Sequence, residues 1–275
     1  MTIIDTHLHL IYPDRVSYPW LAGAPAINKP WHIESYFAEA EPLGIEAALH
    51  MEVDVAEADI EAETRFVTSL HPKLIGAIAG CRPGEAGFAE WLEVASTIGG
   101  VKAMRQVIHS LPAEAILTPL FIENLKRLPA YDLPFDLCIR AEQLLTVGKP
   151  LIEKCPHVAF VLDHMALQDA DPAKFPGWKA GIAELARSPN LVCKISGVCG
   201  YIGEPTPEKV RPYVEHAISC FGWERVVWGS DHPVVTQHAS LTRWVEITQA
   251  LLAGASAGEK ARLLRENARR VYRLG

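Results

Sequence analysis

Two histidines near the start of the chain are spaced for shared chemistry. His7 and His9 lie in Asp5-Thr6-His7-Leu8-His9, at the end of a short apolar run. Residues two apart on a strand face the same side, so both imidazoles point in one direction if this run is a strand. Two converging imidazoles can bind a divalent metal ion or a polar substrate. For the motif taken alone, a pair of histidines in a polar turn is the alternative.

Two further motifs place polar groups directly after apolar runs. His164 ends Val161-Leu162-Asp163-His164, and Asp231 follows Val227-Trp228-Gly229-Ser230. Gly229 allows close backbone packing before Asp231, whose carboxylate can ligate a metal ion or take a proton from water. A capping aspartate with a surface histidine is the alternative for the first motif, and a helix-capping aspartate for the second.

Three cations and one acid follow or lie within other apolar runs. Arg105, Arg140 and Lys194 are positioned to bind a carboxylate or to stabilise a developing oxyanion, and each could equally form a structural ion pair. Glu52 is a candidate metal ligand, a base, or the salt-bridge partner of one of these cations. Trp20 could line a pocket for a sugar or a flat ring.

The elements that position these groups are short strands alternating with helices. The expected strands are continuous Val-, Ile- and Leu-rich runs, as in a parallel sheet covered on both faces: 3–10, 47–53, 74–80, 101–105, 135–139, 159–163, 191–196 and 226–230. Stretches of helical period lie between them: 57–70, 87–98, 118–128, 143–155, 178–186, 207–221 and 241–252. This alternation predicts a (β/α)8 TIM barrel, with an open doubly wound sheet as the second choice.

Barrel geometry then brings the polar groups together. Active sites of such barrels lie at the carboxyl ends of the strands. Closure of the barrel sets the eighth strand beside the first, so Asp231 is expected to face His7 and His9. An extra helix at 257–274 is expected to pack on the barrel.

Bulk properties limit the function classes. With 275 residues, 49% of them hydrophobic and 21% charged, residues 1–275 are expected to form a single domain. A net charge of −7 argues against nucleic-acid binding, and no apolar run reaches the roughly 18 residues of a membrane helix. Six scattered cysteines and the lack of a cationic, apolar leader favour a cytoplasmic location.

The ordered motifs resemble the amidohydrolase-2 family of the amidohydrolase superfamily. Within it, they are most similar to the lactonase group, which contains sugar-acid lactonases and 2-pyrone-4,6-dicarboxylate lactonase. The matching stretches are Ile4-Asp5-Thr6-His7-Leu8-His9, Tyr18-Pro19-Trp20, Gly100-Val101-Lys102 through Arg105, Phe135-Asp136-Leu137, Val161-Leu162-Asp163-His164, Val192-Cys193-Lys194-Ile195-Ser196-Gly197, Gly229-Ser230-Asp231 and Glu266-Asn267-Ala268. The resemblance implies an amidohydrolase-type TIM barrel that hydrolyses a lactone, with active-site positions at His7, His9, Arg105, His164 and Asp231.

Three positions depart from the family pattern. The fifth strand ends in Cys138-Ile139-Arg140, where members with a firmly held metal carry a histidine. His232 stands where tryptophan is frequent, and Glu52 where a neutral residue is frequent. One divalent metal ion, zinc or manganese, on His7, His9 and Asp231 with Glu52 is one expectation, and the missing strand-five histidine leaves metal-independent action as the alternative.

The resulting hypothesis is hydrolysis of a small carboxylated or hydroxyl-rich lactone by water attack at the barrel mouth. Asp231 accepts the proton of water, while His164 and Arg105 act on the carbonyl; Arg140, Lys194 and Trp20 bind substrate. Two alternatives remain: a metal-dependent non-oxidative decarboxylase on the same scaffold, and a non-catalytic barrel that binds a sugar acid. The expected partner is a small molecule, and a homo-oligomer is one option for the assembly.

Overall fold

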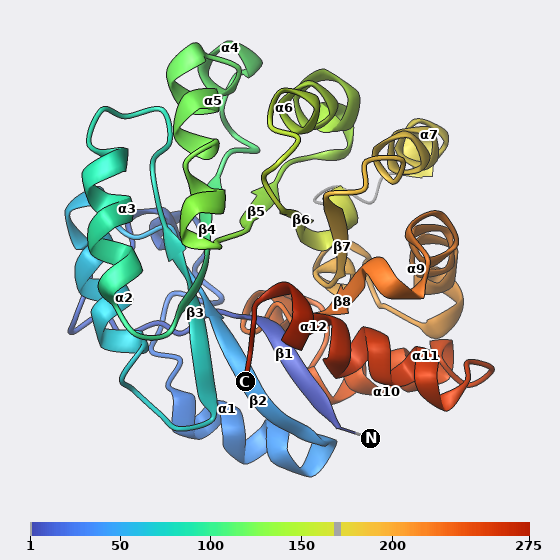
Figure 1. Ribbon diagram of the computed structural model, residues 1–275. Coiled ribbons are helices and arrows are strands. Elements are labelled where there is room, and N and C mark those ends of the chain that lie inside the picture. Colours follow the sequence, from blue (N-terminus) through green and yellow to red (C-terminus); the bar gives the residue numbers. More distant parts are fainter. Residues whose placement is uncertain (1, 168–171) are drawn as a thin grey trace.

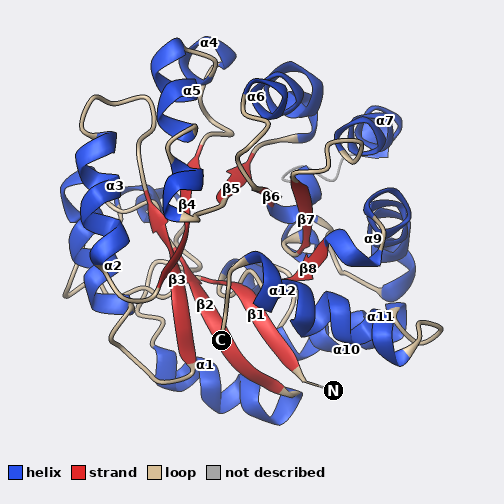
Figure 2. Ribbon diagram, viewed as in Figure 1, coloured by secondary structure: helices blue, strands red, loops and turns tan. Residues whose placement is uncertain are grey.

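Eight parallel strands form one sheet in sequence order, β1 to β8, in the computed structural model (Figure 1). The structure describes residues 2–167 and 172–275. Each strand pairs with the next along the chain, and helices surround the sheet (Figure 2). The strands are β1 (Ile3–Leu8), β2 (Ile45–Met51), β3 (Leu74–Gly80), β4 (Val101–Val107), β5 (Phe135–Cys138), β6 (Phe160–Leu162), β7 (Leu191–Ile195) and β8 (Val226–Trp228). The predicted barrel is confirmed, and every predicted strand end lies within two residues of the observed one.

β8 meets β1 through a short connection rather than a full ladder. Leu8 and His232 form an isolated parallel bridge. The Asp231 N–H donates to the His7 carbonyl at 2.9 Å, and the His9 N–H donates to the His232 carbonyl at 2.8 Å. These bonds hold the HxH motif of β1 against the residues that follow β8.

The helices lie outside the strands: α1 (Ile33–Ala40), α2 (Ile60–Val67), α3 (Phe88–Thr97), α4 (Ala113–Ile116), α5 (Pro119–Leu125), α6 (Lys149–Lys154), α7 (Phe175–Leu185), α8 (Val198–Tyr201), α9 (Pro207–Phe221), α10 (Leu241–Leu251), α11 (Ala257–Ala261) and α12 (Asn267–Val271). Local sequence starts several of them. Thr118 and Thr206 accept a backbone N–H at the beginning of α5 and α9, and a proline follows each threonine at the first helical position. The sequence prediction missed α1, α4 and α8, two of which are a single turn long.

The core has an inner and an outer part. Side chains inside the barrel, including Ile4, Leu49, Ile78 and Val161, form one apolar cluster, and the outward faces of the strands pack against the helices in a larger one. Tyr272, just after α12, belongs to the inner cluster. The predicted C-terminal helix is therefore present and packs on the barrel. No helix among the described residues is long and apolar enough to span a membrane.

Candidate functional site

A cavity of about 400 Å³ opens at the carboxyl ends of the strands. Its wall combines polar groups from β4 and from the residues that follow β1, β6 and β8 with aromatic and neutral side chains of the connecting loops. The lining side chains include His9, Trp20, Arg105, His109, Cys138, His164, Tyr201, Asp231 and Gln237. Of the residues predicted to act in the site, four line this cavity besides Trp20: His9, Arg105, His164 and Asp231.

His7, His9 and Asp231 form a compact donor cluster. The Nε2 atoms of the two histidines are 3.2 Å apart, and Asp231 Oδ1 lies 3.7 Å from each of them. Two donors bound to one tetrahedral zinc ion at about 2.0–2.2 Å are roughly 3.2–3.6 Å apart. One ligand atom from each residue lies within 4.8 Å of the others. The donor types and their spacing therefore fit a single divalent ion.

Burial keeps the imidazoles of the site neutral. Burial lowers the pKa of His7 well below its ordinary value, and His164 and Lys194 lower it further. The pKa of His9 is lowered by burial and by Arg105, and that of His164 is lowered to about 3, chiefly by burial. Metal binding requires the neutral imidazole, so His7 and His9 can act as ligands at neutral pH without losing a proton.

One carboxylate oxygen of Asp231 has no partner among the described side chains. Its Oδ2 atom is buried and without a hydrogen-bond partner among the described residues. Burial raises the pKa of Asp231 well above its ordinary value, and the neighbouring Arg105 opposes this shift. A buried carboxylate with an elevated pKa and an available oxygen is suited to accept a proton.

Asp5 ties together the elements that carry the cluster. Its Oδ1 atom accepts the backbone N–H groups of His7 at 3.0 Å and Ser230 at 2.8 Å. Its Oδ2 atom accepts the hydroxyl groups of Tyr36 on α1 and Ser230, both at 2.5 Å. Sequence reasoning gave Asp5 no role, although its place in the DxHxH motif was a usable signal. We assign it the role of fixing β1, β8 and α1 relative to one another.

The backbone is unusual at two of the predicted catalytic residues. His164 and Asp231 have φ values of 54° and 59°, in the left-handed region. Such conformations cost about 1–3 kcal/mol each and persist only where the surroundings enforce them. Two glycines make room here: a Cβ at Gly197 would lie 2.5 Å from His164 Nδ1, and one at Gly229 would lie 2.7 Å from the His7 Cβ. The close approach predicted for Gly229 is confirmed.

Arg105 lies in the cavity wall, where contacts with Glu52 and Asp163 hold its guanidinium group in place. Its Nε donates to Glu52 Oε1 at 2.7 Å, its Nη2 to the Glu52 carbonyl at 2.8 Å, and its Nη1 lies 3.5 Å from Asp163 Oδ2. The second carboxylate oxygen of Glu52 accepts the Asp54 N–H at 2.7 Å. Glu52 therefore forms a salt bridge with Arg105, and both of its carboxylate oxygens contact groups outside the donor cluster.

Lys194 lies beneath the cavity rather than in its wall. It is fully buried, its Nζ forms ion pairs with Asp136 and, at 3.0 Å, with Asp163 Oδ1, and it lies 3.4 Å from His7 Nδ1. Burial lowers the pKa of Lys194, but the two carboxylates more than compensate and raise it overall. Asp163 Oδ1 also lies 3.5 Å from His7 Nδ1, so Asp163, which sequence reasoning left without a role, links both buried cations to His7. The Asp163–His7 contact can orient the imidazole in the way second-shell carboxylates orient metal ligands.

The two other residues predicted to bind substrate have different positions. Arg140 is exposed, and its side chain is not part of the cavity wall. Trp20 lines the cavity, and its indole N–H donates to the Val53 carbonyl at 2.6 Å. Apolar and amide side chains of the first loop, α8 and the loop after β8 complete this part of the wall, including Ile27, Tyr201 and Gln237.

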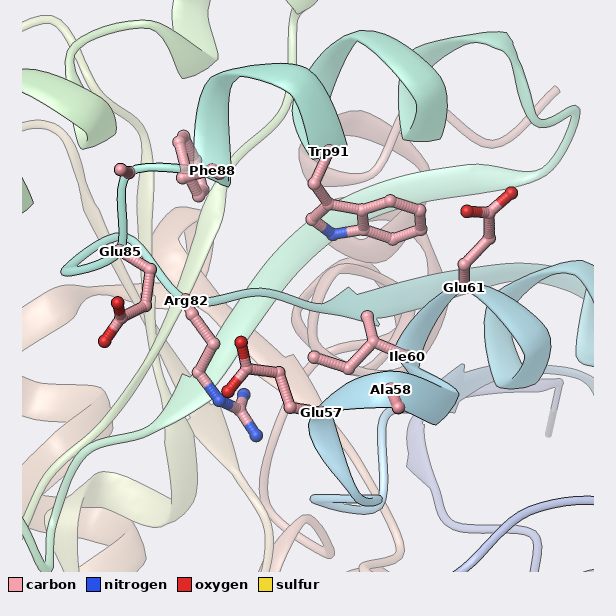
Figure 3. A pocket seen from close by; sticks show the side chains of 10 residues that line it. Glu57, Ala58, Ile60, Glu61, Arg82, Glu85, Phe88 and Trp91 are labelled. Carbon is pink, nitrogen blue, oxygen red and sulfur yellow. The ribbon is translucent and has the colours of Figure 1, made fainter.

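A second cavity, of about 440 Å³, lies between α2 and α3 (Figure 3). The Trp91 and Phe88 rings and three glutamates, at positions 57, 61 and 85, line it. It contains none of the predicted site residues. Arg82 in its wall pairs at 3.1 Å with Asp54, which lines the cavity at the barrel mouth. His9, Arg105, His164 and Asp231 line the barrel-mouth cavity instead.

Comparison with known proteins identifies the family of this chain and agrees with its barrel fold. A family model described as amidohydrolase matches residues 4–274. Two L-fucono-1,5-lactonases are similar in sequence. That of Burkholderia multivorans is 27% identical, with 98% of this chain and 96% of the lactonase aligned. That of Burkholderia ambifaria is 24% identical, with 86% of this chain and 84% of the lactonase aligned. A crystal structure of an amidohydrolase from Burkholderia multivorans with bound zinc superposes with a TM-score of 0.89 at 21% identity, covering 100% of both chains. The family match spans nearly the whole sequence, and the chain belongs to the amidohydrolase family of hydrolases.

Proposed function

We propose that this hydrolase opens a small, hydroxyl-rich lactone, a sugar-acid lactone, in the cavity at the barrel mouth. The observation that carries the proposal is the convergence of Asp231, His164 and Arg105 on one cavity of about 400 Å³. The similarity to two L-fucono-1,5-lactonases supports the same substrate class.

The charges of the wall favour a sugar lactone over a dicarboxylate. Arg105 brings the positive charge, and Glu52 already compensates it at 2.7 Å. Asp231 adds a carboxyl group to the same wall, and the charge of Asp54 is paired with Arg82 at 3.1 Å. Trp20, Tyr201 and Gln237 offer an aromatic surface and neutral hydrogen-bonding groups, which suit a hydroxylated ring.

In the proposed mechanism, Asp231 holds the attacking water and accepts its proton through Oδ2. Arg105, held rigid by Glu52 and Asp163, donates to the lactone carbonyl and stabilises the oxyanion that develops there. His164 is held by a 2.8 Å hydrogen bond between its Nδ1 and Ser196 Oγ, and its Nε2 lies 3.8 Å from Asp231 Oδ1. It can therefore orient the same water or the tetrahedral intermediate.

His7, His9 and Asp231 would hold a single divalent ion, zinc or manganese. When bound, the ion supplies Lewis acidity and lowers the pKa of water. Glu52 is not proposed as a ligand, because its oxygens contact Arg105 and Asp54. Action without a metal is the alternative, with Arg105 and His164 alone polarising the carbonyl.

A proton-release assay on a lactone panel tests the proposal. The panel contains L-fucono-1,5-lactone, an L-rhamnonolactone, D-glucono-1,5-lactone and 2-pyrone-4,6-dicarboxylate, and is run before chelation, after chelation and after addition of zinc or manganese. Turnover of a sugar lactone supports the proposal, and failure with every lactone refutes it. Loss on chelation with recovery on metal addition supports the metal site, and indifference to chelation supports the metal-free alternative.

The same protein distinguishes the rival functions. Release of carbon dioxide from an aromatic acid would establish the decarboxylase alternative, and tight binding of a sugar acid without turnover would establish the binding protein. Asp231→Asn should fold as the wild type does and lose nearly all turnover, whereas Asp14→Asn, on an exposed loop, should keep it. Wild-type turnover in Asp231→Asn would refute the assignment of the base.

A further inference from the structure

The backbone that follows β2 contacts three side chains of the candidate site. This β2 exit segment comprises the last residue of the strand and the three residues after it: Met51, Glu52, Val53 and Asp54. Its first carbonyl lies 3.0 Å from His9 Nδ1, its second accepts the Arg105 Nη2 group at 2.8 Å, and its third accepts the Trp20 indole N–H at 2.6 Å. Three consecutive carbonyl groups therefore contact three side chains that line the cavity.

A glutamate outside the cavity wall holds the middle of this segment. Glu63 lies on α2, and its Oε1 atom accepts the Val53 N–H at 3.2 Å. The carbonyl of the same peptide unit, that of Glu52, accepts the Arg105 guanidinium. A peptide unit is planar, so its carbonyl and N–H groups cannot turn independently. Glu63 therefore contacts Arg105 through one rigid peptide unit.

His50 fixes Glu63 in turn. Leu49 and Met51 belong to the apolar cluster inside the barrel, so His50 between them points outward, toward α2. Its Nε2 atom lies 3.3 Å from Glu63 Oε1, and both residues are buried. The other polar atoms of the pair, His50 Nδ1 and Glu63 Oε2, have no hydrogen-bond partner among the described residues. Such atoms cost stability when buried, so stability alone does not account for the pair.

The end of the segment has a backbone conformation that needs support. Asp54 has a φ of 46°, in the left-handed region. A residue other than glycine keeps such a backbone only where its surroundings enforce it. The Asp54 N–H donates to Glu52 Oε2 at 2.7 Å, and its carboxylate pairs with Arg82 at 3.1 Å. The segment is therefore held at two points, by Glu63 at Val53 and by Arg82 at Asp54.

We propose that Glu63, oriented by His50, is a positioning residue of this hydrolase. It holds the β2 exit segment so that the carbonyls of the segment keep Arg105 and Trp20 directed at the bound lactone. Arg105 is the proposed donor to the developing oxyanion, and a displacement of about 1 Å in a positioned group can slow a reaction by about 100-fold. The inference rests on the proposed lactone hydrolysis and adds to it two residues that lie outside the cavity wall.

Two variants of similar size separate the hydrogen bond from packing. Glu63→Leu removes the acceptor, whereas Glu63→Gln keeps a side-chain oxygen that can accept the Val53 N–H. On the best lactone of the panel, Glu63→Leu should lower kcat by about 10- to 100-fold and raise KM, and Glu63→Gln should stay within about threefold of the wild type. Glu61→Leu, on the exposed face of the same helix, is the control and should keep wild-type values.

The Trp20 indole N–H reports the same contact without any substrate. The chain has 7 tryptophans, and the Trp20 signal is identified in a nitrogen–proton correlation spectrum by its loss in Trp20→Phe. Glu63→Leu should shift this signal, because the Val53 carbonyl that accepts the indole N–H moves. The signals of Trp178 and Trp244, buried on α7 and α10, should stay in place, whereas a general loosening of the fold would shift them too.

A double-mutant cycle tests whether Glu63 acts through Arg105. If it does, adding Glu63→Leu to Arg105→Met should lower kcat by less than about threefold, because the guanidinium is already absent. An independent structural role would give the same loss of kcat in both backgrounds.

An unshifted Trp20 signal in Glu63→Leu, equal losses of kcat in Glu63→Leu and Glu63→Gln, or full additivity with Arg105→Met would overturn the inference. If Glu63→Leu does not fold, Glu63→Asp makes the same test. Its carboxylate is one methylene group shorter and is withdrawn from the Val53 N–H, so the same shift of the Trp20 signal is expected. If the wild type opened no lactone, the proposed function would fail, and the indole signal would still decide whether Glu63 holds the segment.

Discussion

Replacing Lys194 with methionine separates a structural role from substrate binding. The Lys194 Nζ atom is fully buried between Asp136 and Asp163, 3.0 Å from Asp163 Oδ1. Methionine has a similar length but leaves both carboxylates without their common cation. Breaking a buried ion pair by removing one partner costs about 3–5 kcal/mol, so we expect a loss of this size in the free energy of unfolding.

The expected shift in melting temperature follows from chain length. At roughly 2.1 cal/mol/K per residue near 60 °C, 275 residues give an unfolding entropy of about 0.6 kcal/mol/K. A loss of about 3–5 kcal/mol then lowers the midpoint by about 5–9 °C. The loss should be larger at pH 8 than at pH 6. Burial already raises the pKa of Asp136 to about 7, and removal of Lys194 raises it further. The carboxyl group ionises at a lower pH in the unfolded chain than in the folded protein, so the folded protein loses stability as the pH rises toward the raised pKa.

Thermal unfolding followed by circular dichroism at both pH values measures the effect. Arg140→Met is the matched control, because Arg140 is exposed, and its midpoint should lie within about 1 °C of the wild type. Adding Asp136→Asn to Lys194→Met should recover part of the loss. If Lys194→Met melted like Arg140→Met at both pH values and only raised KM, the buried-network reasoning would be refuted and Lys194 would contact substrate.

Three further outcomes are expected. Glu52→Gln should bind as much metal as the wild type but lose about 10-fold or more in kcat, because Arg105 loses a charge-assisted hydrogen bond of about 1.5–3 kcal/mol. A loss of bound metal in this variant would instead make Glu52 a ligand. Gly197→Ala should lose most activity and at least about 1–2 kcal/mol of stability, because the residue has a left-handed backbone and the new Cβ would lie 2.5 Å from His164 Nδ1. Gly99→Ala is the control and should be tolerated, because the space around Gly99 is open. Equal activities of the two variants would contradict this reasoning. The urea concentration at the unfolding midpoint of the metal-free protein should decrease when the pH is lowered from 7 to 5. Burial lowers the pKa of His164 to about 3, whereas the unfolded chain takes up this proton near pH 6.5, so acid favours the unfolded chain. A constant midpoint would argue against neutral buried histidines.

The amino-acid sequence by itself determined the barrel and the edge at which the polar residues of the candidate site meet. Buried parallel strands are continuous apolar runs, and this local property gave all eight strands within two residues of their ends. The polar residues that end those runs, His9, Arg105, His164 and Asp231, line one cavity because strand ends of a barrel share one face. Short helices such as α8 escaped prediction, because one turn carries too little periodicity.

Which polar groups meet, and which of them face the cavity, was decided only by the tertiary structure. Glu52 and Arg105 are far apart in the sequence, and their pairing depends on how β2 and β4 are arranged around the barrel. Lys194 carries the same charge as Arg105 and also lies on a strand, but its position along β7 directs it into a buried network below the site. The contact between Cys138 and His109 likewise arises where β4 and β5 end side by side. Charge and residue type are local properties of the chain, whereas burial and partner choice follow from the packing of distant strands.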